Sequence, residues 1–90
     1  MAGLDGEWKV RRLGGLLPPL IGVRKEIHGA SGETRVGRLP GAAFDLVGLE
    51  LRYRAPFSGF VDELEPHGER YLGRATFRGR ELGRFVLERL

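Results

Sequence analysis

The chain has 90 residues, with 15 basic and 12 acidic residues, a formal net charge of +3 and no cysteine. This length predicts one domain, residues 1–90, and a hydrophobic fraction of 41% predicts a folded chain rather than a disordered one. The composition excludes disulfides and thiolate metal sites, and no apolar run approaches the roughly 18 residues that cross a bilayer. The N-terminus lacks the basic region followed by an apolar stretch that is typical of a signal peptide, so we expect a cytoplasmic protein.

Glycine is frequent, with 15 residues, and it interrupts every stretch before a helical period of a dozen residues can develop. The short runs between the glycines alternate in character, which is typical of strands. In chain order, the predicted strands are Glu7–Leu13, Leu20–His28, Glu33–Leu39, Ala43–Val47, Leu49–Arg54, Gly59–Leu64, Arg70–Phe77 and Glu81–Leu90. Eight short strands with short turns predict an all-β fold, a compact antiparallel up-and-down barrel that leaves no free edge.

The first and last strands carry a recognisable pattern. The first opens with Gly6-Glu7-Trp8-Lys9-Val10, and the last contains Gly83-Arg84-Phe85-Val86-Leu87-Glu88-Arg89. These residues resemble the calycin superfamily, which comprises lipocalins, fatty-acid-binding proteins and their short bacterial relatives. The resemblance implies that Gly6 and Trp8 are structural, with the indole closing one barrel end under Arg84 or Arg89. Such a cation–π contact is worth about 0.5–2 kcal/mol.

The resemblance does not extend to a lipid anchor. Fatty-acid-binding proteins carry an arginine-x-tyrosine pair on the last strand that holds the lipid carboxylate, whereas this chain has Arg84-Phe85-Val86. The ligand-binding residues must therefore be predicted from the residues themselves.

Strand alternation assigns side chains to the barrel interior. The expected inward residues include Ile21, Val23, Lys25, Ile27, Leu49, Leu51, Tyr53, Phe60, Asp62, Leu64, Gly73, Ala75, Gly83 and Phe85. Apolar walls with a few polar groups are typical of small-molecule sites. We therefore predict a pocket for a modest-sized, mainly apolar ligand, lined by Val23, Lys25, Ile27, Leu51, Tyr53, Phe60, Asp62 and Phe85.

Two features of this interior have alternative interpretations. Lys25 and Asp62 could anchor the polar end of a ligand or pair with each other, or Lys25 could reach water at the rim. The small residues Gly73, Ala75 and Gly83 could leave space for a ligand, or could make room for Trp8 or a phenylalanine.

A binding protein without catalytic residues, cofactor or metal is the leading hypothesis. His28 and His67 lack further ligands at zinc-like spacing. The first alternative is a cofactor-independent enzyme of isomerase or cyclase type, in which Lys25, Tyr53 or Asp62 acts as acid or base.

A second alternative is a basic barrel that binds nucleic acid or a protein partner. Arg74, Arg78 and Arg80 suggest it, although interleaved glutamates argue against nucleic acid. The apolar segment Leu16, Leu17, Pro18 and Pro19 could cap the barrel, admit a ligand or bury itself in a homodimer contact.

Overall fold

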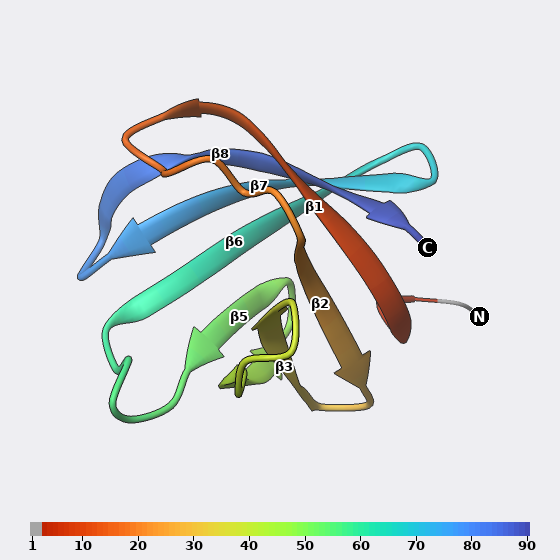
Figure 1. Ribbon diagram of the computed structural model, residues 1–90, viewed down its shortest axis with the longest axis horizontal. Helices are drawn as coiled ribbons and strands as arrows, with labels where there is room; N and C mark the ends of the chain where they lie inside the picture. Colours follow the sequence, from red (N-terminus) through yellow and green to blue (C-terminus); the bar gives the residue numbers. More distant parts are fainter. Residues whose placement is uncertain (1–2) are drawn as a thin grey trace.

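The computed structural model describes residues 3–90 and contains eight strands (Figure 1). In chain order these are β1 (Gly6–Gly15), β2 (Val23–His28), β3 (Ser31–Val36), β4 (Ala42–Val47), β5 (Glu50–Tyr53), β6 (Phe60–His67), β7 (Arg70–Phe77) and β8 (Arg80–Arg89). Each strand pairs with the next, and β8 pairs with β1 in antiparallel register to close the barrel. The predicted all-β, antiparallel up-and-down barrel is confirmed.

Closure of the barrel rests on a long β1–β8 ladder that runs from Trp8 opposite Arg89 to Gly15 opposite Gly83. The register shifts between Arg12 and Gly14, which is a bulge that bends the strand. No helix long and apolar enough to cross a membrane occurs in residues 3–90.

Most predicted strand boundaries differ from the structure by one to three residues, and two of these differences have a clear cause. β2 begins at Val23 rather than Leu20, because the chain turns at Gly22, whose φ of 77° is left-handed. β6 continues beyond Leu64 to His67, since a two-residue turn at Gly68 lets the β6–β7 ladder run to its end despite Pro66.

Alternation along the strands positions most of the core as predicted. Trp8, Ile27, Phe44, Leu51 and Leu87 are fully buried. The predictions for Ile21 and Leu49 are wrong: they are 89% and 42% exposed. Both residues lie in connections outside the strands, where the period of two no longer sets the direction of a side chain.

The up-and-down order divides the connections between two barrel ends. One end, here called the Trp8 end, holds residues 3–5, the two-residue turns 29–30, 48–49 and 68–69, and Leu90. The other, here called the loop end, collects residues 16–22, 37–41, 54–59 and 78–79. The C-terminus and the start of β1 lie on the right of the view in Figure 1.

Candidate functional site: a buried polar cluster and an external cleft

Trp8 closes its end of the barrel through three kinds of contact. Its indole Nε1 donates a hydrogen bond to the Leu4 carbonyl at 2.8 Å, and its ring meets the edge of Tyr71. The Arg89 guanidinium lies 4.1 Å from the centre of the indole and donates to the carbonyls of Asp5 and Gly3. Of the two candidate arginines, Arg89 therefore packs on Trp8.

Arg84 lies elsewhere. Its exposed guanidinium pairs with Glu81 at 3.1 Å on the outer face of β8. Gly6 also has a definable role, because a Cβ at this position would come 2.8 Å from Nη1 of Arg89. The glycine before Trp8 thus leaves the space that the stacked arginine occupies.

A cluster of four polar side chains lies inside the barrel. Lys25 Nζ donates to Thr34 Oγ1 at 2.7 Å and to the Tyr53 hydroxyl at 2.6 Å, and it forms an ion pair with Asp62 Oδ2 at 2.9 Å. The Tyr53 hydroxyl donates to the same Asp62 oxygen at 2.9 Å. Lys25 is only 3% exposed and Asp62 only 7%.

Electrostatics holds this cluster in one protonation state. Burial alone would lower the pKa of Lys25, but the Asp62 carboxylate and the Tyr53 hydroxyl outweigh it and raise that pKa above its ordinary value. Burial raises the pKa of Tyr53, and the Asp62 charge adds to the effect despite the opposing ammonium of Lys25. The lysine is therefore charged and the phenol neutral over the whole physiological range.

The cluster satisfies itself, which limits what it can do for a ligand. An ammonium has three donors, and Thr34, Tyr53 and Asp62 accept all three. A charged ammonium also has no lone pair with which to act as a base or nucleophile. Of the alternatives that the sequence left open, the structure shows the one in which Lys25 and Asp62 pair.

Thr34 is the member of the cluster that the sequence analysis missed. It lies directly opposite Lys25 in the β2–β3 ladder. Its side chain can be placed only once the register of the two strands is known, and nothing within β3 by itself marks it as a partner of a lysine on another strand.

The other residues predicted to line a pocket lie in three different places. Ile27, Leu51 and Phe85 are core residues exposed by 3% or less. Phe60 lies at the rim, with its ring 4.6 Å from that of Phe77. Val23, at the start of β2, lines a cleft on the outside of the barrel.

The small inward residues of β7 and β8 make room for other side chains. A Cβ on Gly73 would come 2.2 Å from the ring of Phe85, so this ring occupies the space beside the glycine. A Cβ on Gly83 would meet Leu17 Cγ at 2.6 Å. Gly73 therefore makes room for a phenylalanine, as one of the two interpretations predicted. Gly83 makes room for Leu17.

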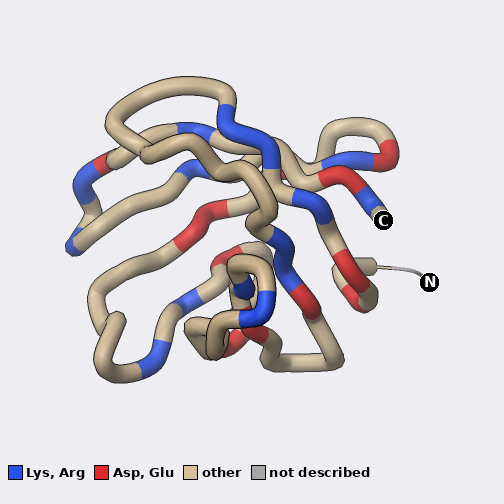
Figure 2. The backbone as a smooth tube through the Cα atoms, in the orientation of Figure 1, with Lys and Arg blue, Asp and Glu red and all other residues tan. Residues whose placement is uncertain are grey.

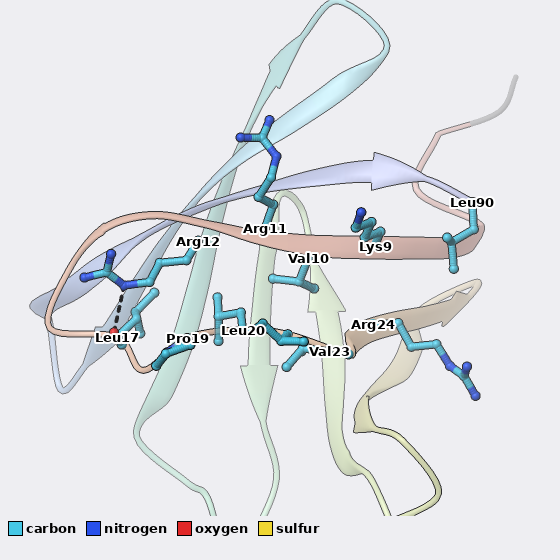
Figure 3. Close-up of a pocket in the computed structure, with 12 residues that line it drawn as sticks. Lys9, Val10, Arg11, Arg12, Leu17, Pro19, Leu20, Val23, Arg24 and Leu90 are labelled. Carbon is cyan, nitrogen blue, oxygen red and sulfur yellow. Dashed lines mark hydrogen bonds between the residues drawn. The ribbon is translucent and has the colours of Figure 1, made fainter.

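The external cleft, of about 960 Å³, lies between β1 and residues 17–23 (Figure 3). It exists because β1 pairs with β2 only over Gly6–Lys9. Beyond Lys9, β1 continues along β8 alone, and the connection to β2 runs beside it without a ladder. Val10 and Leu20 point toward the space between them in Figure 3, and Leu17, Pro19 and Val23 extend the apolar lining.

Cations surround this apolar lining. Arg11 pairs with Glu88, and Arg24 with Glu26. Arg12 instead donates to the carbonyls of Leu17 at 2.8 Å and Gly15 at 2.6 Å, which fixes its guanidinium beside the cleft. Within residues 3–90, neither Arg12 nor the exposed Lys9 forms an ion pair with a carboxylate. The guanidinium of Arg12 is thus held by backbone carbonyls without a carboxylate partner, whereas Lys9 lies opposite Glu88 in the β1–β8 ladder.

The arginines that suggested nucleic-acid binding are not equivalent. Arg74 pairs with Glu63 at 2.7 Å and with Glu81 at 2.9 Å, so its charge is compensated. Arg78 packs over the ring of Phe77. Figure 2 shows basic and acidic residues interleaved along most of the strands, as the sequence suggested.

In the part of the chain that the structure describes, no three His, Asp or Glu side chains lie close enough together to bind a metal ion. Comparison with family models gives no match, and neither curated proteins nor solved structures show a match to this chain. The architecture, an eight-stranded closed antiparallel barrel, is compatible with a calycin-like fold.

Proposed function

We propose that this protein binds a small amphipathic molecule with an anionic group, in the cleft between β1 and residues 17–23. The observation that carries the proposal is the combination of an apolar lining with the Arg12 guanidinium, which has no carboxylate partner, in a cleft of about 960 Å³. A calycin-like binding role belongs to the same proposal, with the site on the flank of the barrel rather than in its interior.

The apolar part of the ligand would lie against the partly buried side chains of Leu17, Leu20 and Val23. Drug-sized ligands occupy pockets of roughly 300–1,000 Å³ with mainly apolar walls and a few placed polar groups, and this cleft is at the upper end of that range. Burial of apolar ligand surface would provide most of the binding free energy.

The charged part of the ligand would lie near Arg12, and Lys9 lies three residues away on the same strand. Backbone carbonyls hold two nitrogens of Arg12 in place, so binding an anion costs little ordering of that side chain. A carboxylate, sulfonate or phosphate suits a guanidinium fork better than a neutral polar group does.

Titration with 1-anilinonaphthalene-8-sulfonate, an apolar probe with a sulfonate, tests the proposal by its fluorescence. Leu20→Gln, which places a polar group in the lining, is expected to weaken probe binding roughly tenfold, from the transfer free energy of one leucine. Lys9→Gln is expected to weaken it about threefold or more, with a larger effect at low salt.

The matched controls are Leu49→Gln and Arg52→Gln, which change an exposed leucine and a cation far from the cleft lining. They are expected to leave the affinity unchanged. Equal losses in the controls, or no probe binding below millimolar concentration, would overturn the proposal.

A further inference from the structure

Three of the four connections of the loop end expose large apolar side chains. Leu16 and Ile21 are 87% and 89% exposed, Leu39 is 65% exposed and Phe57 is 45% exposed. One residue of this kind is ordinary on a protein surface, but here each of three neighbouring connections presents at least one.

Hydrogen bonds join these connections in pairs. The Gly37 amide donates to the Gly22 carbonyl, which ties residues 37–41 to residues 16–22. The Arg78 amide donates to the Gly59 carbonyl, which ties residues 78–79 to residues 54–59. The exposed apolar side chains therefore project from a fixed rim rather than from independent loops.

The charges of the rim are all positive. Residues 16–22, 37–41, 54–59 and 78–79 contain Arg38, Arg54 and Arg78, and they contain no aspartate or glutamate. Figure 2 marks basic positions along these connections and no acidic ones. Asp45 compensates Arg54, which leaves Arg38 and Arg78 there and Arg12 at the base of residues 16–22.

We propose that the loop end docks on the surface of an anionic lipid bilayer, with Leu16, Ile21, Leu39 and Phe57 inserted among the headgroups and Arg38 and Arg78 against the lipid phosphates. Apolar side chains that enter the interface and cations that face anionic headgroups are the two contributions to such binding. This inference does not depend on an occupied cleft.

Two features favour a bilayer over other acidic partners. Aliphatic side chains outnumber aromatic ones among the exposed apolar residues of this end, with Leu16, Ile21 and Leu39 against Phe57 and Phe60. Single-stranded nucleic acid is instead held by aromatic side chains on which bases stack. The apolar side chains also project from separate connections, which suits a fluid headgroup layer better than the contiguous apolar core of a protein interface.

Co-sedimentation with vesicles tests the inference. The protein is expected to bind vesicles containing phosphatidylglycerol and to bind vesicles of phosphatidylcholine alone much more weakly. Leu16→Ser/Ile21→Ser is expected to lower the partition coefficient roughly tenfold or more. Arg38→Gln/Arg78→Gln is expected to lower it about 25-fold at low salt, since each basic residue near such a surface contributes about fivefold.

Matched controls come from the opposite end of the barrel. Leu49→Ser removes an exposed leucine from the turn 48–49, and Arg70→Gln removes a cation next to the turn 68–69. Both are expected to partition like the unchanged protein. All substituted side chains are at least partly exposed, and circular dichroism of each variant checks that the barrel is intact.

Three results would overturn the inference. The first is equal partitioning to charged and uncharged vesicles, or none to either. The second is a loss in Leu49→Ser as large as in Leu16→Ser/Ile21→Ser. The third is tight binding to a single-stranded oligonucleotide that survives Leu16→Ser/Ile21→Ser, which would identify nucleic acid as the partner. Failure of probe binding in the cleft would leave the vesicle result unaffected, so the two proposals fail separately.

Discussion

Lys25 has three N–H donors, and the barrel places an acceptor opposite each of them. A charged side chain can be buried only when its partners replace the water it has lost. Within the cluster, Asp62 provides the compensating charge and the Tyr53 hydroxyl bridges the two ions. The cluster is therefore a structural element of the interior, and removing either Lys25 or Asp62 leaves the other buried without its counter-ion.

Lys25→Met is expected to lower the free energy of unfolding by about 3–5 kcal/mol, because Asp62 then remains buried without a cation. Lys25→Met/Asp62→Leu removes both charges and is expected to be more stable than Lys25→Met alone. Urea unfolding of the two variants, followed by the fluorescence of Trp8, measures the difference. A double variant that is no more stable than Lys25→Met would contradict this account of the pair.

Arg89 and Arg84 offer a second comparison at the scale of single residues. Arg89→Met removes a cation–π contact and two hydrogen bonds to the carbonyls of residues 3–5, so it is expected to cost about 1–3 kcal/mol. Arg84→Met removes only an exposed ion pair and is expected to cost below about 1 kcal/mol. Thermal unfolding measures both variants, and equal losses would show that the stacked arginine contributes no more than a surface one.

At the scale of elements, the connection between β1 and β2 has more structural roles than any other connection in residues 3–90. Residues 16–22 run beside β1 without a ladder, and Arg12 holds their first residues through backbone carbonyls. Leu17 packs into the space that Gly83 leaves. One connection thereby covers part of the core, lines the cleft and contributes to the exposed rim of the loop end.

Close packing of β7 against β8 depends on Gly73. Gly73→Ala would place its Cβ 2.2 Å from the Phe85 ring, and it is expected to cost about 1–3 kcal/mol through overpacking. Gly14→Ala is the matched control, because its Cβ would meet nothing within 4 Å. Gly73→Ala/Phe85→Leu should recover part of the loss. Chemical unfolding measures the free energy of unfolding of the three variants. A Gly73→Ala variant as stable as the unchanged protein would refute the packing argument.

At the scale of the whole molecule, the buried cluster makes the stability of the barrel depend on alkaline pH. The pKa values of Lys25 and Tyr53 are both raised in the folded chain. Above about pH 10 the unfolded chain loses protons that the folded chain retains. Stability is therefore fully present below about pH 10 and falls as the pH rises beyond it.

The free energy of unfolding is accordingly expected to fall between about pH 10 and about pH 12, by up to about 1.4 kcal/mol per pH unit for each group. Urea titrations at several pH values measure the slope. Lys25→Met/Tyr53→Phe/Asp62→Leu lacks the titrating groups, and its slope is expected to be shallower. Identical slopes in the two proteins would show that the cluster does not couple to unfolding.

The sequence is sufficient to predict the fold class, because the period of two in the strands and the glycine-rich turns depend on local chemistry alone. It also determined that Trp8 and Lys25 face inward, since both lie within strands. It could not choose between Arg84 and Arg89, nor place Ile21 and Leu49, whose directions depend on where the strands end.

The surroundings of each inward residue depend on the tertiary structure. Thr34 contacts Lys25, and Phe85 fills the space beside Gly73, because of the register of neighbouring strands. A shift of that register by one residue would turn every side chain of the strand to the opposite face. The cleft beside β1 likewise arises from a ladder that stops at Lys9 and a chain that continues along β8. Contacts between residues far apart in the chain form only when the strands pair and the barrel closes, and no local pattern in the sequence encodes them.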